Sequence, residues 1–168
     1  DINTPIWGDG KSVLYMQDEK LHLYENEKTA IIDEGVKSFS PAGERIIYWK
    51  EQEAFAYKAS DNKPSLLAAT KEPISHIVSA KGDGSLLIST NPTPLDYSFY
   101  LLKGKELEKI TSWSSSTSST VENILYDSNG EEGSILIESF KMTQGERASM
   151  ANLLSFSMKD RKVSENEQ

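Results

Sequence analysis

The chain has 168 residues, enough for one domain of ordinary size that buries a hydrophobic core without disulfide staples. It has no cysteine, which excludes disulfides, thiolate nucleophiles and zinc–thiolate sites. The 26 acidic and 18 basic residues give a formal net charge of −8, which opposes binding to nucleic acid. No apolar run is long enough to cross a membrane, so we expect a soluble, acidic protein.

Short runs of alternating apolar residues follow one another along the chain, bounded by Gly, Asp, Asn, Pro or Ser, as in strands and turns. In chain order, strands are predicted within residues 10–16, 21–24, 30–33, 43–49, 54–57, 65–69, 76–80, 82–89, 97–103, 130–139 and 150–160. The segment 143–156 also has helical spacing at Met150, Leu153 and Leu154. Because its run LLSFSM alternates as a strand does, we favour the strand.

Several of these runs are copies of one another. GKSVLYM at 10–16 aligns without a gap with GERIIYW at 43–49, and LHLY at 21–24 aligns with AFAY at 54–57 at the same offset of 33 residues. Looser copies follow, and the four apolar cores begin at Val13, Ile46, Leu86 and Ile135. The sequence therefore predicts about four units, each with three or four antiparallel strands.

The segment FSPAGERIIYW at 39–49 resembles the repeat of TolB-like and WD40-like β-propellers, in which F/W-S-P-x-G-x-x-I/L-x-Y/F forms a turn and the strand after it. The matching positions are Phe39, Ser40, Pro41, Gly43, Ile46 and Tyr48. Pro41 would restrict φ ahead of the turn, and Gly43 would take a conformation that a Cβ resists. The match is strong in this repeat, recognisable in the first, and weak in the third and fourth.

The resemblance implies an all-β fold of antiparallel, propeller-like meanders within a single domain spanning 1–168; a β-sandwich of consecutive hairpins is the alternative. Four units are fewer than the six to eight blades of most closed propellers. Three arrangements stay open: a compact four-unit propeller, part of a propeller completed by another copy or by further sequence, or the sandwich. An open array would expose sheet edges and apolar faces, which favours closure or a partner, including self-association.

Aromatic side chains at turn or loop edges are the best candidates for a binding surface. Trp7 and Trp113 lie at such edges, whereas Trp49 ends an alternating strand and is expected to pack between sheets. The tract WSSSTSST at 113–120 has almost nothing apolar to bury, which predicts a mobile surface loop. Trp7 and Trp113 are therefore the predicted interface residues.

One turn is a candidate calcium site. Asp127, Asn129 and Glu131 place oxygen ligands at alternate positions around a glycine in DSNGEEGS. Asp, Asn and Gly are also the residues that build hairpin turns, and this second interpretation is favoured.

Catalytic motifs are weak throughout the sequence. His22 and His76 have no second His or carboxylate at ligand spacing, and no Gly-x-Ser-x-Gly elbow is present. The acidic residues cluster in predicted turns, where no spacing singles out a glycosidase pair. No cofactor is expected.

The best functional hypothesis is a non-enzymatic binding or scaffold module that engages a protein or glycan partner through its loops. The alternatives are a carbohydrate-active hydrolase or lyase that uses a carboxylate pair, and a sensor domain of a membrane-anchored envelope protein. The chain starts at DINTPIW without an initiator Met or a signal peptide, which suggests a processed extracytoplasmic domain, secreted or anchored as in a lipoprotein.

Overall fold

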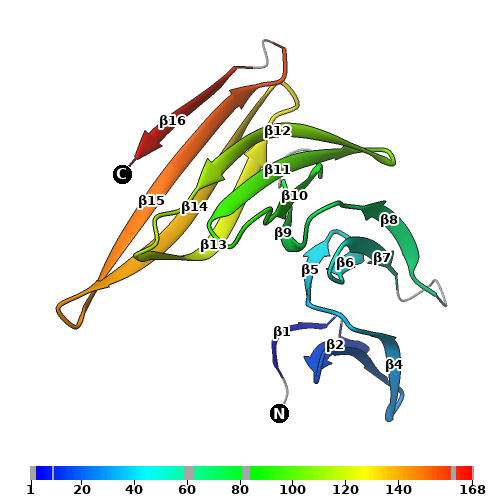
Figure 1. Cartoon of the computed structure of the whole chain (residues 1–168). Helices are drawn as coiled ribbons and strands as arrows, with labels where there is room; N and C mark the ends of the chain where they lie inside the picture. Colours follow the sequence, from blue (N-terminus) through cyan, green and yellow to red (C-terminus); the bar gives the residue numbers. More distant parts are fainter. Residues whose placement is uncertain (1–2, 9, 59–62, 81–83, 160–161, 168) are drawn as a thin grey trace. The chain divides into compact units, whose positions relative to one another are not determined.

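The computed structural model describes residues 3–8, 10–58, 63–80, 84–159 and 162–167, with the side chains of all of these except 3–7 and 167. Within these ranges the regular structure is β, in four antiparallel sheets of four strands each (Figure 1). No helix in the described ranges is long and apolar enough to cross a membrane. The all-β prediction is confirmed.

Each sheet is a meander of strands that are consecutive in sequence. The first contains β1 (Asn3–Gly8), β2 (Ser12–Gln17), β3 (Lys20–Glu25) and β4 (Lys28–Glu34). The second contains β5 (Ser38–Ala42), β6 (Arg45–Trp49), β7 (Glu53–Tyr57) and β8 (Ser65–Ala69). The third contains β9 (Ile74–Ser79), β10 (Leu86–Thr90), β11 (Asp96–Lys103) and β12 (Glu106–Ser114). The fourth contains β13 (Ser119–Ser128), β14 (Glu132–Thr143), β15 (Glu146–Ser157) and β16 (Val163–Glu167).

The repeat is confirmed strand by strand. Val13, Ile46, Leu86 and Ile135 all lie in the second strand of their sheet. The predicted partner runs form the third strands, and the extra short runs at 30–33 and 65–69 form fourth strands. Residues 146–157 form β15, so the strand interpretation is right and the helical one wrong. Met150 and Leu153 lie opposite Ser139 and Leu136 of β14, and this pairing overrides their helical spacing.

The motif of the second repeat is mostly strand. Phe39, Ser40 and Pro41 lie in β5, so the turn is confined to the two residues after Ala42. Pro41 is tolerated because β5 is an edge strand, where a missing N–H breaks no ladder bond. Gly43 has φ of 68°, the conformation that a Cβ resists.

The chain divides into two compact units, residues 1–77 and 78–168, with the boundary inside β9. In the first unit one core is buried between the first and second sheets; its members are Leu14, Met16, Leu21, Val36, Phe39, Ile46, Tyr48 and Tyr57. In the second unit the core lies between the third and fourth sheets; its members are Ala80, Leu87, Phe99, Leu101, Ile124, Tyr126, Ile135, Ile137, Leu154 and Phe156. Each unit is thus a pair of packed, blade-like sheets.

Candidate functional site: a polar cleft beside Trp113

The longest described strands, β14 and β15, extend past the apolar core of the second unit. β14 and β15 each have 12 residues. Alternate residues of β14 face the third sheet, and Ile135 and Ile137 on this face are buried in the core. Further along the same face come Ser139 and Lys141, which are polar. The face of β14 is therefore apolar where the two sheets pack and polar further along, where it forms one wall of a cleft.

The opposite wall comes from β12 and the segment after it. Trp113 lies opposite Tyr97 of β11, and their rings are tilted at 53° with centroids 5.8 Å apart. A register shift leaves Ile110 without a partner, because Thr111 pairs with Phe99 and Lys109 pairs with Tyr100. This bulge allows Ile110 and Trp113, three residues apart, both to pack against the core.

The two walls enclose a cleft of about 370 Å³, here called the Trp113 cleft. It is lined by Trp113, Ser114, Ser115, Ser116, Ser118, Ser119, Ser139, Lys141, Met150, Asn152 and Glu165. Trp113 Nε1 donates a hydrogen bond of 3.1 Å to Glu165 Oε1, and Asn152 Nδ2 donates to the same oxygen at 3.3 Å. These bonds tie β12 and β15 to β16 and hold the indole ring in place.

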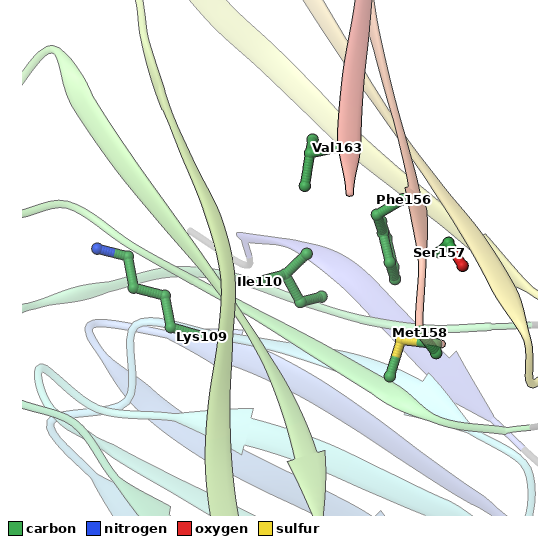
Figure 2. A pocket seen from close by; sticks show the side chains of 6 residues that line it. All are labelled: Lys109, Ile110, Phe156, Ser157, Met158 and Val163. Atoms are coloured by element: carbon green, nitrogen blue, oxygen red, sulfur yellow. The ribbon is translucent and has the colours of Figure 1, made fainter. Parts of the chain in front are cut away.

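A small apolar cavity of about 80 Å³ lies in the same unit, lined by Lys109, Ile110, Phe156, Ser157, Met158 and Val163. Figure 2 shows Ile110 projecting from β12 towards Phe156 and Met158, while Lys109 projects away from them. A void of this size, with no convergent charged groups, is smaller than ligand pockets usually are. We therefore take the Trp113 cleft as the candidate site.

The predicted binding residues have different outcomes. Trp113 lies in the cleft, and the Ser/Thr tract after it supplies much of the lining. The loop prediction for that tract holds only for residues 115–118, because its ends belong to β12 and β13. Trp7 lies in β1 opposite Leu14, and its side chain is outside the described part of the structure. The structure thus brings only Trp113 into a described site.

The predicted calcium residues lie at the β13–β14 hairpin, which confirms the turn. Asn129 Oδ1 accepts hydrogen bonds from the backbone N–H groups of Glu131 and Glu132 at 2.9 and 2.8 Å. Asp127 Oδ1 accepts one from Ser128 N at 2.9 Å. Among the described residues, no group of three or more His, Asp or Glu side chains is arranged to hold a metal ion. The side chains of Asp127 and Asn129 therefore stabilise the turn, and calcium binding here stays a prediction.

The histidines lie apart from the cleft lining. His22 projects from β3 on the face opposite Leu21, and its ring stacks on Tyr15 with centroids 4.9 Å apart. Burial lowers the pKa of His76, and among the described atoms its Nδ1 has no hydrogen-bond partner. Neither ring belongs to a described cluster of ligating groups.

In the first unit, a cluster of hydrogen-bonded and charged side chains connects the first sheet to the second. Tyr48, fully buried in β6, donates a 2.8 Å hydrogen bond to Asp33 Oδ2 of β4, and Lys50 Nζ lies 2.8 Å from Asp33 Oδ1. Burial would raise the pKa of Asp33, but hydrogen bonds from Lys50, Tyr48 and Glu34 N, with the Lys50 charge, outweigh it and lower that pKa. The pKa of Tyr48 is raised far above its ordinary range, mainly by burial and to a smaller extent by the hydrogen bond to Asp33. This cluster fastens the first sheet to the second.

Sequence reasoning missed the residues that complete the cleft with Trp113. Lys141, Asn152 and Glu165 lie on three different strands, and no local motif connects them. The only available signal was the length of the alternating pattern in 132–143, which exceeds what one core needs.

Four-stranded antiparallel meanders that pack face to face are typical of proteins built from β-propeller blades. The chain has four blade-like sheets and is a partial β-propeller in fold. No protein-family model matches the chain, and no curated protein matches it.

Solved structures show the same fold over nearly the whole chain. Kluyveromyces lactis Hsv2 is 7% identical, with 98% of this chain and 72% of that chain covered and a TM-score of 0.55. The extracellular domain of a putative one-component system from B. thetaiotaomicron is 14% identical, with 98% and 22% covered and a TM-score of 0.59. A putative TolB from Agrobacterium tumefaciens is 10% identical, with 94% and 62% covered and a TM-score of 0.54. At such identities they establish the fold, which confirms the propeller resemblance.

Proposed function

We propose that this chain is a non-enzymatic binding module whose ligand is a glycan held in the Trp113 cleft. The observation that carries the proposal is one indole ring set among hydroxyl, amide, ammonium and carboxylate groups in a cleft of about 370 Å³. This volume lies within the range of small-molecule sites. The cleft also lies beside the packed core of the third and fourth sheets, and regular strands position much of its lining.

The chemistry of the lining favours a sugar over a protein surface. A pyranose has apolar C–H faces that can stack on an aromatic ring and hydroxyls that both donate and accept hydrogen bonds. The cleft offers Lys141 as a donor, Glu165 as an acceptor, and Asn152 with the serines as both. A protein interface would instead need an apolar centre with a polar rim.

The absence of catalysis is part of the proposal. A glycosidase of the usual type needs a carboxylic acid whose pKa is raised so that it can protonate the leaving group. Asp33 and Asp96, two carboxyls whose pKa clearly departs from the ordinary value, are both shifted downward. For Asp96 the cause is hydrogen bonds from Ser114 and Thr93. This shift is opposite to the one that a general acid requires.

Oligosaccharide binding tests the proposal directly. The protein is titrated by calorimetry with oligosaccharides of neutral hexoses, N-acetylhexosamines and uronic acids. Binding to at least one class is expected, with affinity about tenfold weaker in Trp113→Ala and largely kept in Trp113→Phe. Tyr24→Ala, which removes an exposed aromatic side chain of the first unit, is the matched control and should bind as wild type.

Three results would contradict the glycan proposal. They are no binding to any class, equal binding by Trp113→Ala, or capture of a protein through the cleft with no sugar bound. Mass spectrometry of the oligosaccharides after incubation tests the non-enzymatic part, which predicts that they remain intact.

We also propose an extracytoplasmic location, because a glycan-binding module acts where polysaccharides are exposed. Fractionation of the source cells should place the full-length protein in the envelope or the medium. Recovery in the cytosolic fraction would contradict this. Recovery with the membrane fraction would favour the sensor or lipoprotein form of the hypothesis.

Finally, we propose that the chain self-associates. The exposure of large apolar side chains on sheet faces, among them Tyr24, Ile31 and Leu125, supports this.

A further inference from the structure

The sequence repeat places equivalent residues on equivalent faces of the sheets. Ile46 and Ile135 begin their apolar runs and face the sheet before them within the same unit, where they are 1% and 0% exposed. Val13 is the equivalent residue of the first sheet, yet it is 37% exposed. The first sheet therefore presents a face that the second and fourth sheets bury.

This leading face, as we call it, carries Val13, Tyr15, His22, Tyr24 and Ile31. Cross-strand pairs join them: Val13 with Tyr24, Tyr15 with His22, and His22 with Ile31. Tyr24 and Ile31 are 45% and 49% exposed. Side chains of this size gathered on one sheet face mark an interaction surface.

The second sheet shows what covers such a face. At the offset of 33 residues, the stack of Tyr15 on His22 corresponds to the stack of Tyr48 on Phe55, and both pairs of rings are nearly parallel. Tyr48 and Tyr57 are buried against the first sheet. Tyr24 corresponds to Tyr57 but is exposed. The covering element expected on the leading face is thus another blade-like sheet.

The fourth sheet presents the complementary face. Leu14 and Leu87 occupy one repeat position, and in the cores of their units they are 1% and 0% exposed. Leu136 occupies this position in β14 but is only partly buried. It forms a cross-strand row with Leu125 of β13 and Leu153 of β15, and Leu125 is 42% exposed. Leu125, Leu136 and Leu153 define what we call the trailing face.

We propose that the leading face of one copy of this chain docks onto the trailing face of a second copy. The contact would repeat the packing that each unit already contains, of Leu14 with Ile46 and of Leu87 with Ile135. A second copy is the occupant because this chain itself carries the complementary apolar face at the matching repeat position. The proposal deepens that of self-association and does not depend on the Trp113 cleft.

A contact between two different faces is heterologous, and it produces a ring when the rotation closes. The first product of this contact is a dimer, in which the leading face of one copy covers the trailing face of the other.

The test is sedimentation equilibrium of the full chain over a wide range of concentration. Wild type is expected to dimerise. Ile31→Lys on the leading face and Leu125→Lys on the trailing face should each weaken dimerisation roughly tenfold or more, since each buries a charge in an apolar contact. Leu66→Lys is the matched control, because Leu66 is 53% exposed on β8 and lies outside both faces.

Mixing the two charged variants separates this arrangement from others. Each variant keeps the face that the other has lost, so a mixture should regain one joint and form heterodimers. A monomeric wild type would overturn the proposal, as would dimerisation of Leu125→Lys at wild-type strength or equal weakening by Leu66→Lys. All three substituted side chains are exposed in the single chain, so thermal melting should confirm that the variants fold. The Trp113 variants report on the glycan proposal alone, so the two proposals can fail separately.

Discussion

Both units consist of two packed, blade-like sheets, but the units differ in what lies beside the apolar core between these sheets. In the first unit, Tyr48, Asp33 and Lys50 join the sheets through a hydrogen-bonded cluster. In the second, the long strands β14 and β15 run on past the apolar core and form the wall of the Trp113 cleft. Strands that extend past the core thus form a cleft in the second unit, whereas in the first unit hydrogen-bonded side chains fill the equivalent space between the sheets.

The largest expected effect on stability comes from truncating a core side chain in each unit. Phe99 is fully buried in the second unit, and Phe99→Ala should lower the free energy of unfolding by about 3–5 kcal/mol through lost burial and a cavity. Urea unfolding measures it. Leu14→Ala, in the matching core of the first unit, should cost about 2–5 kcal/mol. A loss below about 1 kcal/mol at either site would contradict this view of the two joints.

A smaller effect is expected where a ring crosses a glycine of the fourth sheet. A Cβ on Gly133 would overlap Cζ of Phe156, the residue opposite it on β15. Gly133→Ala should therefore destabilise the protein by about 1–3 kcal/mol through overpacking. In the double variant with Phe156→Leu, the alanine should cost less than it does alone. Additive losses in thermal unfolding would show that the ring moves aside without cost.

The joint of the first unit should make stability depend on acid pH. Because the pKa of Asp33 is lower in the folded chain than in the unfolded chain, its contribution is fully present above the unfolded value of about 3.9. The contribution is lost as pH falls through the lower folded pKa. Asp33→Asn should flatten this part of the profile of unfolding free energy against pH. An unchanged slope in the variant would assign the acid sensitivity to other carboxylates.

The smallest expected effect concerns hairpin turns, where the two units also differ. The β3–β4 turn has Asn26 and Glu27 at φ of 54° and 62°, while the β14–β15 turn has Gln144 followed by Gly145 at 53° and 80°. Two positive φ values suit Asn-Gly best. Glu27→Gly should stabilise the chain by about 0.5 kcal/mol, and Gly145→Ala should destabilise it by about 1 kcal/mol. Thermal unfolding with both changes of the same sign would contradict this account.

Much of the fold was predictable because its signals are local. Val13, Ile46, Leu86 and Ile135 marked the second strand of every sheet, since apolar alternation and turn residues act over a few positions. The same repeat placed these residues on equivalent faces. The one ambiguous segment, 146–157, became a strand because β14 offered it a twelve-residue partner.

The candidate site was predictable only in part. Trp113 stood out as an aromatic residue beside a polar tract, but Lys141, Asn152 and Glu165 did not. Glu165 gains its importance from the hydrogen bonds of Trp113 and Asn152, residues 52 and 13 positions away. Such contacts depend on how sheets pack, which no local spacing encodes.

The sequence by itself determined the strands, the four-unit repeat and the turns, because side-chain alternation and backbone preference need only neighbouring residues. Tertiary structure decided which faces are buried and where the core between two sheets opens into a cleft. It left Val13 exposed although Ile46 and Ile135 are buried, and Leu136 only partly buried although Leu14 and Leu87 are buried. The physical reason is that a sheet face is buried only where another sheet packs on it. The same repeated pattern is therefore buried between the two sheets of a unit and exposed on the leading face.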